Sequence, residues 1–184
     1  AVQALKLGKI DCIVIDEAPA NAFVEINPEL SILEEDFAVE EYAICISKKN
    51  PQLREDINSA ISQLKQDGTL EKIISNYIGD STKGQFPYIP KKDVDRSNGT
   101  LKVATNATFA PYEYIEGGEI IGIDIDLAKA VGEILGVTVE FKPIDWNSKE
   151  MELSSKKIDC IWNGMSVNAK RQASMSLTNK YLNN

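Results

Sequence analysis

The sequence predicts an α/β fold organised as two similar lobes. Short, nearly continuous apolar runs of strand length alternate with helical patterns, which is typical of sheets whose strands are buried on both faces. Residues 80–99 contain Gly, Pro and charged residues without a hydrophobic period, and they predict a linker. On either side of it, residues 5–13 (LKLGKIDCI) and 153–161 (LSSKKIDCI) agree at six of nine positions. This echo favours two units of similar build, with chance or shared turn chemistry as the alternative.

The part of the chain before the linker alternates strand and helix signals. Nearly continuous apolar residues over 10–15 predict a buried strand, and Pro51 stands where prolines begin helices. In order, we expect a helix end closed by Gly8, a strand at 10–15, a helix ending near 27–28, a short edge strand at 32–33, a strand at 42–46, and helices at 51–64 and 69–77, the last capped by Thr69.

The pattern restarts after the linker. Its clearest helix spans 124–135, with apolar residues at helical spacing and Gly136 as a stop signal. In order, we expect a strand at 101–105, a loop and short strand at 109–114, a turn at 116–118, the helix at 124–135, a strand at 137–141, a weak helix at 148–157, a buried strand at 158–162, and a helix that Asn168 caps.

The composition restricts the function. The chain has 184 residues, with 28 Asp and Glu against 20 Lys and Arg, and the formal net charge of −8 argues against a nucleic acid or an anionic membrane as partner. It has no His, which excludes catalytic triads and zinc sites that need an imidazole. Cys12, Cys45 and Cys160 lie far apart in apolar runs, so we expect buried free thiols. No cofactor and no metal site is expected.

The two ends of the chain carry no targeting signal. Ala1 lies within a predicted helix and the last residues directly follow a strand-like or loop-like run, so we interpret both ends as cuts. We expect no signal peptide and no anchor in this chain, an absence that says little about the compartment. No apolar run approaches about 18 residues, so no membrane span is expected.

The segment 162–171 (WNGMSVNAKR) carries the strongest candidate for binding chemistry. Arg171 falls in the first turn of the helix that follows Asn168, where the helix dipole disfavours a cation unless an anion is bound there. Its guanidinium fits a carboxylate with two parallel hydrogen bonds. Gly164 allows a ligand to approach the backbone closely, and Ser166 adds a hydroxyl group. The alternative is a surface arginine paired with one of the many acids.

Other candidates follow the carboxyl ends of predicted strands, where ligands bind in open α/β sheets. The carboxylate of Asp16 suits an ammonium group, although a helix N-cap is equally consistent with its position. Phe109 and Trp146 fit a pair of rings on either side of a ligand's side chain, whereas Tyr112 and Tyr114 fit core packing better. No nucleophile has a candidate base nearby in sequence, and no Gly-rich phosphate loop is found.

Several motifs resemble the extracellular (periplasmic-type) solute-binding proteins of polar amino acid ABC transporters, family 3. They are LKVATNATFAPYEY at 101–114, IGIDIDLA at 121–128, KIDCIWNGMS at 157–166 with an arginine after it, and, like the family's C-terminal segments, EYAI at 41–44 and LKQDGTL at 64–70. The resemblance implies a periplasmic-binding-protein-like α/β fold, with one nearly complete lobe plus part of a second lobe in this chain.

The resemblance also implies roles for individual residues. In such proteins two lobes close on one amino acid, whose charged ends and side chain are bound by separate groups of residues. Carried over by motif, these are Arg171, Ser166 and Gly164 for the α-carboxylate, Asp16 for the α-ammonium, Phe109 and Trp146 beside the side chain, and Asn106 and Asn163 for polar groups.

The order of the segments departs from that of the family, because the C-terminal portion comes first and half of the second lobe is missing. The resemblance divides the chain into 1–37 (partial second lobe), 38–79 (strand and helices that complete a first lobe), 80–99 (linker) and 100–184 (first lobe). A fragment of a tandem pair is favoured over a circular permutant. In the fragment Asp16 and Arg171 belong to different sites, and in the permutant they share one.

The resulting prediction is a binding protein rather than an enzyme. We expect reversible binding of a polar amino acid outside the cytoplasm, in the periplasm or at the cell surface, and delivery to an ABC transporter permease by lobe closure near residues 37–42. With half a lobe missing, this chain alone should bind weakly or not at all. The alternatives are a ligand-sensing domain of a receptor and a cyclohexadienyl-dehydratase-like enzyme. A cleft Glu with a raised pKa would indicate the enzyme, and no motif marks one.

Overall fold

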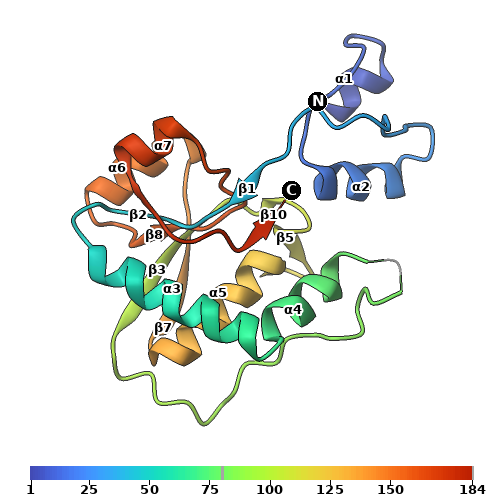
Figure 1. The fold of residues 1–184 in the computed structure, drawn as a ribbon. Helices are drawn as coiled ribbons and strands as arrows, with labels where there is room; N and C mark the ends of the chain where they lie inside the picture. Colours follow the sequence, from blue (N-terminus) through green and yellow to red (C-terminus); the bar gives the residue numbers. More distant parts are fainter. Residues whose placement is uncertain (80, 184) are drawn as a thin grey trace.

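The computed structural model describes residues 1–79 and 81–183 and confirms the α/β class (Figure 1). Asp80 and Asn184, which begin the expected linker and end the expected first lobe, lie outside the described residues. The strands are β1 (Glu41–Tyr42), β2 (Cys45–Ile46), β3 (Thr100–Thr105), β4 (Thr108–Phe109), β5 (Glu113–Glu116), β6 (Glu119–Ile121), β7 (Thr138–Pro143), β8 (Cys160–Ile161), β9 (Ser176–Leu177) and β10 (Leu182–Asn183).

The central sheet has five strands in the order β7–β3–β8–β2–β9. β3 runs parallel to β7 and β8, while β2 runs antiparallel to β8 and β9. Two smaller antiparallel sheets join β1 to β10 and β4 to β5 and β6. The helices are α1 (Val2–Lys6), α2 (Glu17–Ile26), α3 (Pro51–Gln66), α4 (Thr69–Tyr77), α5 (Ile123–Leu135), the 3-10 helix η1 (Trp146–Ser148), α6 (Lys149–Ser154) and α7 (Ala169–Ser174).

Residues in the central strands alternate between two core clusters, one on each face of the sheet. Ile44 and Ile46 belong to the larger cluster, which α3, α4 and α5 cover, whereas Cys45 belongs to the smaller cluster beside α6. In β8, Cys160 faces the larger cluster and Ile161 the smaller one. Burial on both faces, which the apolar runs at 42–46 and 158–162 predict, is confirmed, and so are two buried thiols.

Residues 41–77 and 100–183 share one sheet and one core. Cys45 pairs with Ile161 on one side and with Leu177 on the other, so β2 lies between two strands from the far end of the chain. The apolar faces of α3 and α5 pack together in the larger cluster, as their helical spacing predicts. Segments that are distant in sequence thereby form one α/β layer.

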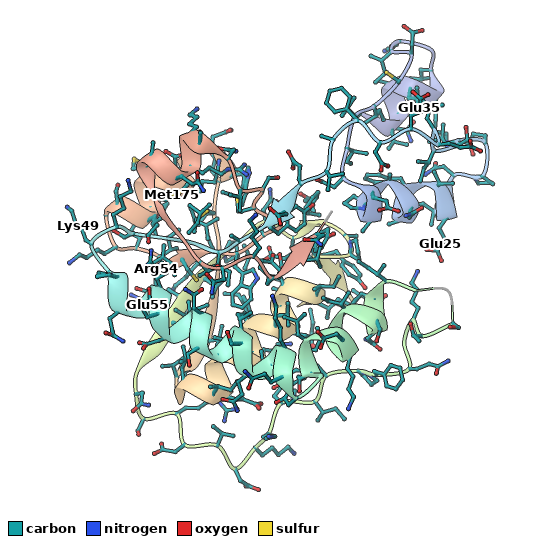
Figure 2. All side chains as sticks on the ribbon, in the orientation of Figure 1. Glu25, Glu35, Lys49, Arg54, Glu55 and Met175 are labelled. Carbon is teal, nitrogen blue, oxygen red and sulfur yellow. The ribbon has the colours of Figure 1, made fainter. Side chains whose placement is uncertain are left out.

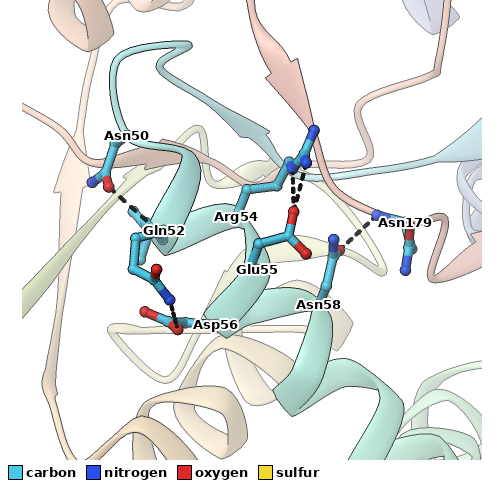
Figure 3. A network of polar contacts seen from close by, with 8 residues as sticks. Asn50, Gln52, Arg54, Glu55, Asp56, Asn58 and Asn179 are labelled. Atoms are coloured by element: carbon cyan, nitrogen blue, oxygen red, sulfur yellow. Dashed lines mark hydrogen bonds and ion pairs between the residues drawn. The ribbon is translucent and has the colours of Figure 1, made fainter.

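Polar contacts fix the start of α3 and attach it to the end of the chain (Figure 3). The Asn50 side-chain oxygen accepts a hydrogen bond from the Leu53 backbone N–H at 3.3 Å and caps the helix. The Asn58 side-chain oxygen accepts a hydrogen bond from the Asn179 backbone N–H at 2.7 Å. The helix is therefore held to the segment between β9 and β10 by a side chain as well as by its apolar face.

The described residues 81–99 of the expected linker run along the surface of this layer. Arg96 forms an ion pair with Glu133 at 3.7 Å, and the Asn98 side chain donates a hydrogen bond to the Leu135 carbonyl at 2.8 Å. This part of the chain is irregular, as its composition predicts, but it is attached to the C-terminal end of α5.

The echo between residues 5–13 and 153–161 is a structural repeat as far as its turn. Gly8 and Lys156 occupy matching places after α1 and α6, and both have left-handed backbones, with φ of 63° and 61°. Shared turn chemistry is therefore part of the echo. After the turn the two copies differ, because only the second continues into a sheet strand, β8.

Three expectations for the N-terminal segment are wrong. Residues 10–15 form no strand and residues 32–33 form no edge strand, since no strand in the described part of the chain lies beside either run. The Cys12 thiol, which we expected to be buried, is exposed for the same reason. In addition, the N-cap of α4 is Gly68, and Thr69, which we expected at the N-cap, is the first residue of the helix.

Residues 1–39 project from the main body, and Glu25 and Glu35 mark this segment in Figure 2. Among these residues Pro19 alone is buried, and Val14, Leu33 and Phe37 are exposed. α2 touches the body through Ala18, which packs against the larger cluster, and through an ion pair of Glu25 with Lys83 at 2.7 Å. The segment thus has little packing of its own.

We expect iodoacetamide to modify Cys12 in the native protein, while Cys45 and Cys160 react only after unfolding. Burial raises the pKa of Cys45 to about 11 and also raises that of Cys160, so neither forms the reactive thiolate readily. Peptide mass spectrometry of protein labelled with and without urea measures the three sites separately. Protection of Cys12 equal to that of Cys45 would show that residues 10–15 are packed.

Candidate functional site

The candidate site lies where β3 and β8 end. These strands are parallel neighbours, so the residues that follow them, Asn106 and Asn163, meet at the same edge of the sheet. The Asn163 side-chain NH₂ donates a hydrogen bond to the Asn106 carbonyl at 3.4 Å. Two residues that the sequence placed in one site are therefore in contact.

A buried acid that sequence reasoning missed lies beneath these two residues. One carboxyl oxygen of Glu113, Oε2, accepts hydrogen bonds from the Asn163 side chain at 2.6 Å and from the Asn106 backbone N–H at 2.9 Å. Glu113 is 1% exposed, and its other oxygen, Oε1, has no partner within the described structure. Burial, with a smaller effect of the nearby Asp124 charge, raises the pKa of Glu113 to about 9. Its position between two aromatic residues was the available signal.

Gly164 holds the centre of the site. Its backbone N–H donates a hydrogen bond to Asp124 Oδ2 at 2.8 Å, and its φ of 50° lies in the left-handed region. A Cβ atom added here would lie 2.7 Å from the Phe109 ring and 3.2 Å from the Tyr42 ring. Glycine is required at this position for both its backbone conformation and its lack of a side chain.

Asp124 is the second buried acid of the site. It is 1% exposed, and Tyr181 donates its hydroxyl proton in a hydrogen bond to Asp124 Oδ1 at 2.8 Å. Burial raises the pKa of Asp124 to about 7, against the opposing effect of its hydrogen bonds. The sequence motif around this residue contributed to the family resemblance, but its role in the site was not predicted.

An aromatic cluster surrounds the glycine. Phe109 stacks on Tyr112 with ring centroids 5.4 Å apart, and Tyr42 meets Tyr112 edge-on at 5.2 Å. Tyr112 is buried, which confirms the core packing expected for it, while Tyr114 is half-buried. Phe109 is also half-buried and lies at the margin of the cluster.

Arg171 and Ser166 lie together on the next stretch of chain. Asn168 caps α7 as predicted, accepting a hydrogen bond from the Arg171 backbone N–H at 2.9 Å. The Arg171 guanidinium is turned back to donate a hydrogen bond to the Ser166 carbonyl at 2.6 Å. Ser166 forms a bridge to Tyr42 and donates its hydroxyl to the Glu40 carboxylate. Within residues 1–79 and 81–183, Arg171 is half-buried and forms no ion pair.

The remaining two candidates approach from other directions. Trp146 packs against the smaller core cluster, and the Lys149 ammonium lies 4.9 Å from its ring centroid. Phe109 belongs with the larger cluster, so sandwiching of a ligand by these two rings stays a prediction. Asp16 is the N-cap of α2, and its charge adds to burial in raising the pKa of Tyr42. It therefore lies near the same aromatic cluster.

Two general features of the described part of the chain complete this description. No helix there has the length and apolar character needed to cross a bilayer. No three carboxylates or thiols come together there closely enough to hold a metal ion.

Together, these features define an α/β lobe with a polar and aromatic edge. Residues 101–184 match the sequence profile of the bacterial extracellular solute-binding proteins, family 3. The arginine-binding extracellular protein ArtP of Bacillus subtilis is 35% identical over 81 residues, which are 44% of this chain and 32% of that protein. The histidine-binding periplasmic protein of Salmonella typhimurium is 32% identical over 101 residues, 54% of this chain and 36% of that protein.

An enzyme and a solved structure are also similar to this chain. The cyclohexadienyl dehydratase of Pseudomonas aeruginosa is 30% identical over 86 residues, 46% of this chain and 32% of the enzyme. A polar amino acid ABC uptake transporter substrate-binding protein from Streptococcus thermophilus is 49% identical, over 41% of this chain and 29% of that chain, with a TM-score of 0.39.

Residues 101–184, somewhat under half of this chain, are therefore similar to the bacterial extracellular solute-binding proteins, family 3. The resemblance found in the motifs at 101–114, 121–128 and 157–166 is thereby confirmed. The chain spans about a third of the length of the curated relatives that it matches.

Proposed function

We propose that this chain binds the α-carboxylate end of a polar amino acid at the edge formed by Gly164, Ser166 and Arg171. The supporting observation is the environment of the Arg171 guanidinium. Its guanidinium is held by the Ser166 carbonyl, half-buried, without an ion pair among the described residues of an acidic chain. A ligand carboxylate would supply the missing anion with charge-assisted hydrogen bonds.

The opposite end of the ligand faces Asp16 in this proposal. Burial raises the pKa of Tyr42, and the charge of Asp16 adds to this effect. Tyr42 also lies beside both Gly164 and Ser166. The two groups assigned to the charged ends of the ligand thus converge on one tyrosine, which supports a single shared site. Phe109, Asn106 and Asn163 would line the side-chain end, with Trp146 as a more distant wall.

The wider role follows from the relatives. Proteins named as arginine-binding and histidine-binding, several of them periplasmic or extracellular, are similar to part of this chain. We propose the same location outside the cytoplasm, and an ABC transporter permease as the partner that receives the amino acid. The ligand-sensing domain of a receptor would use the same binding residues.

One property of Glu113 supports the alternative function, that of an enzyme. Its raised pKa is the property that we expected of a catalytic acid, and a dehydratase is among the relatives. However, Glu113 is buried and its Oε2 is occupied by two internal hydrogen bonds, which favours a structural role. Absence of turnover in a dehydratase assay, together with amino acid binding, is the expected result.

We expect L-arginine, L-histidine or L-glutamine to shift the backbone amide resonances of Gly164 and Ser166 in an NMR titration, with weak affinity. Agmatine, which is arginine without its α-carboxylate, should leave these resonances in place. Arg171→Ala should weaken binding by about tenfold or more, as expected for loss of a charge-assisted hydrogen bond.

Arg54→Ala is the matched control, because Arg54 lies on α3 and pairs with Glu55 away from the site (Figure 3). It should leave the affinity unchanged. Absence of shifts with every common amino acid would overturn the proposed function for this chain. Sub-micromolar binding would instead contradict the view that the site is incomplete.

A further inference from the structure

Two buried acids accept hydrogen bonds from consecutive residues of the loop 163–166. Glu113 accepts a hydrogen bond from the Asn163 side chain at 2.6 Å, and Asp124 accepts one from the Gly164 backbone N–H at 2.8 Å. Both acids are 1% exposed. Neither was assigned a part in ligand binding, yet each holds a residue that was.

Asp124 is itself fixed by the backbone around it. Its own N–H donates a hydrogen bond to the Tyr112 carbonyl at 3.1 Å, which anchors the start of α5 to the segment before β5. Its carboxylate accepts the Tyr181 hydroxyl, and the Tyr181 N–H donates a hydrogen bond to the Tyr42 carbonyl at 3.0 Å. One carboxylate therefore joins α5, the loop 163–166 and the C-terminal segment. A rigid support of this kind is what a preorganised binding loop requires.

We propose that Glu113 and Asp124 are positioning residues that hold Asn163 and Gly164, respectively, so that the backbone at Gly164 and Ser166 is already arranged for the ligand's carboxylate. The inference rests on the proposed function for its last step only, because support of the loop exists without a ligand. Neither acid contacts the ligand in this arrangement.

The chemistry of the two acids differs. A charged Asp124 strengthens its hydrogen bond with the Gly164 N–H, since an ionised acceptor forms the shorter and stronger bond. Glu113, kept neutral by burial, accepts from Asn163 without needing a charge. The titratable groups that act on or are affected by Asp124 are Glu113 and Tyr112 near β5 and Tyr181 on the C-terminal segment.

The test is an NMR titration of the free protein between pH 5 and 9, followed by binding of L-arginine. The Gly164 amide proton should move downfield as the pH rises through about 7, because Asp124 then ionises. Asp124→Asn should abolish this shift while keeping an amide oxygen for the Gly164 N–H. Tyr181→Phe and Glu113→Gln should both retain it.

A second test measures amide exchange in the loop and the affinity for L-arginine. Asp124→Ala should speed amide exchange at Gly164 by about tenfold or more and weaken L-arginine binding to a similar extent, and Asp124→Asn should restore both. If Asp124→Ala does not fold, loss of the pH-dependent shift in Asp124→Asn still tests the contact. A Gly164 shift that persists in Asp124→Asn, or an affinity that Asp124→Ala leaves unchanged, would overturn the proposal.

The two proposals fail in different ways. If no amino acid binds but the free protein shows the expected shift and exchange rates, the support of the loop stands and the proposed function falls. If L-arginine binds equally well to the wild type and to Asp124→Ala, the proposed function stands and the positioning role falls.

Discussion

Glu113→Gln is expected to be more stable than the wild type by about 4 kcal/mol at pH 7.5 and to lose much of the wild-type dependence of stability on pH. Glutamine reproduces the shape and neutrality of the protonated acid. Its side-chain oxygen can accept both hydrogen bonds that Glu113 Oε2 accepts from Asn106 and Asn163.

The sign follows from proton binding. The pKa of Glu113 is raised from 4.5 to about 9 on folding, so between these values the folded protein holds a proton that the unfolded chain has lost. The free energy of unfolding therefore falls as the pH rises through this interval, by about 1.4 kcal/mol for each pH unit. At pH 4 the variant and the wild type should have nearly equal stability.

Urea unfolding at pH 4, 5, 6 and 7.5 measures this difference. Glu116→Gln is the matched control, because Glu116 lies on the same strand, β5, and is exposed. The control should follow the wild type at every pH. The pKa of Asp124 is also raised, to about 7, so Asp124 too makes the free energy of unfolding fall as the pH rises toward neutral. Glu113→Gln should keep this part of the pH dependence. Parallel curves for the wild type and Glu113→Gln would show that Glu113 is charged in the folded protein.

Gly122→Ala should destabilise the protein by about 4 kcal/mol or prevent folding. The φ of Gly122 is 135°, and an added Cβ would lie 2.1 Å from the Tyr112 carbonyl oxygen and 2.9 Å from that of Pro111. Both contacts are with backbone that hydrogen-bonds the start of α5, so no side-chain movement relieves them. The displaced helix start would also carry Asp124 away from Gly164.

Gly117→Ala is the control that measures the cost of backbone strain without the steric overlap expected at Gly122. Gly117 has a left-handed φ of 60° in the turn between β5 and β6, and an added Cβ would meet nothing within 4 Å. We expect a loss of about 1 kcal/mol for this control in urea unfolding. Equal losses in the two variants would contradict the close packing of Gly122 against the preceding segment.

The sequence predicted most elements of the lobe because their signals are local. The helix over 124–135 with its Gly136 stop, the cap at Asn168 and the two-faced strands at 42–46 and 158–162 all depend on spacing within a few residues. The strand expected at 10–15 failed for the opposite reason. Its apolar pattern is as strong, but a strand also needs neighbours to pair with, and spacing within the run carries no information about them.

The residues of the candidate site also divide into those that the sequence identified and those that it did not. Arg171, Ser166 and Gly164 were proposed from their positions after a predicted strand, and Asn106 and Asn163 from the family resemblance. The two buried acids were not, because acidic residues are abundant in this chain and burial depends on tertiary contacts. Only the three-dimensional structure shows that Glu113 and Asp124 lie under the loop.

The position of β2 between β8 and β9 has a consequence for how the protein is made. Its residues leave the ribosome long before either partner strand, which lie more than 100 residues later in the chain. Until those partners emerge, Ala43, Ile44 and Ile46 have no place in a sheet and expose an apolar, aggregation-prone strand. This stretch should therefore stay unpaired in the nascent chain until β8 and β9 have been synthesised.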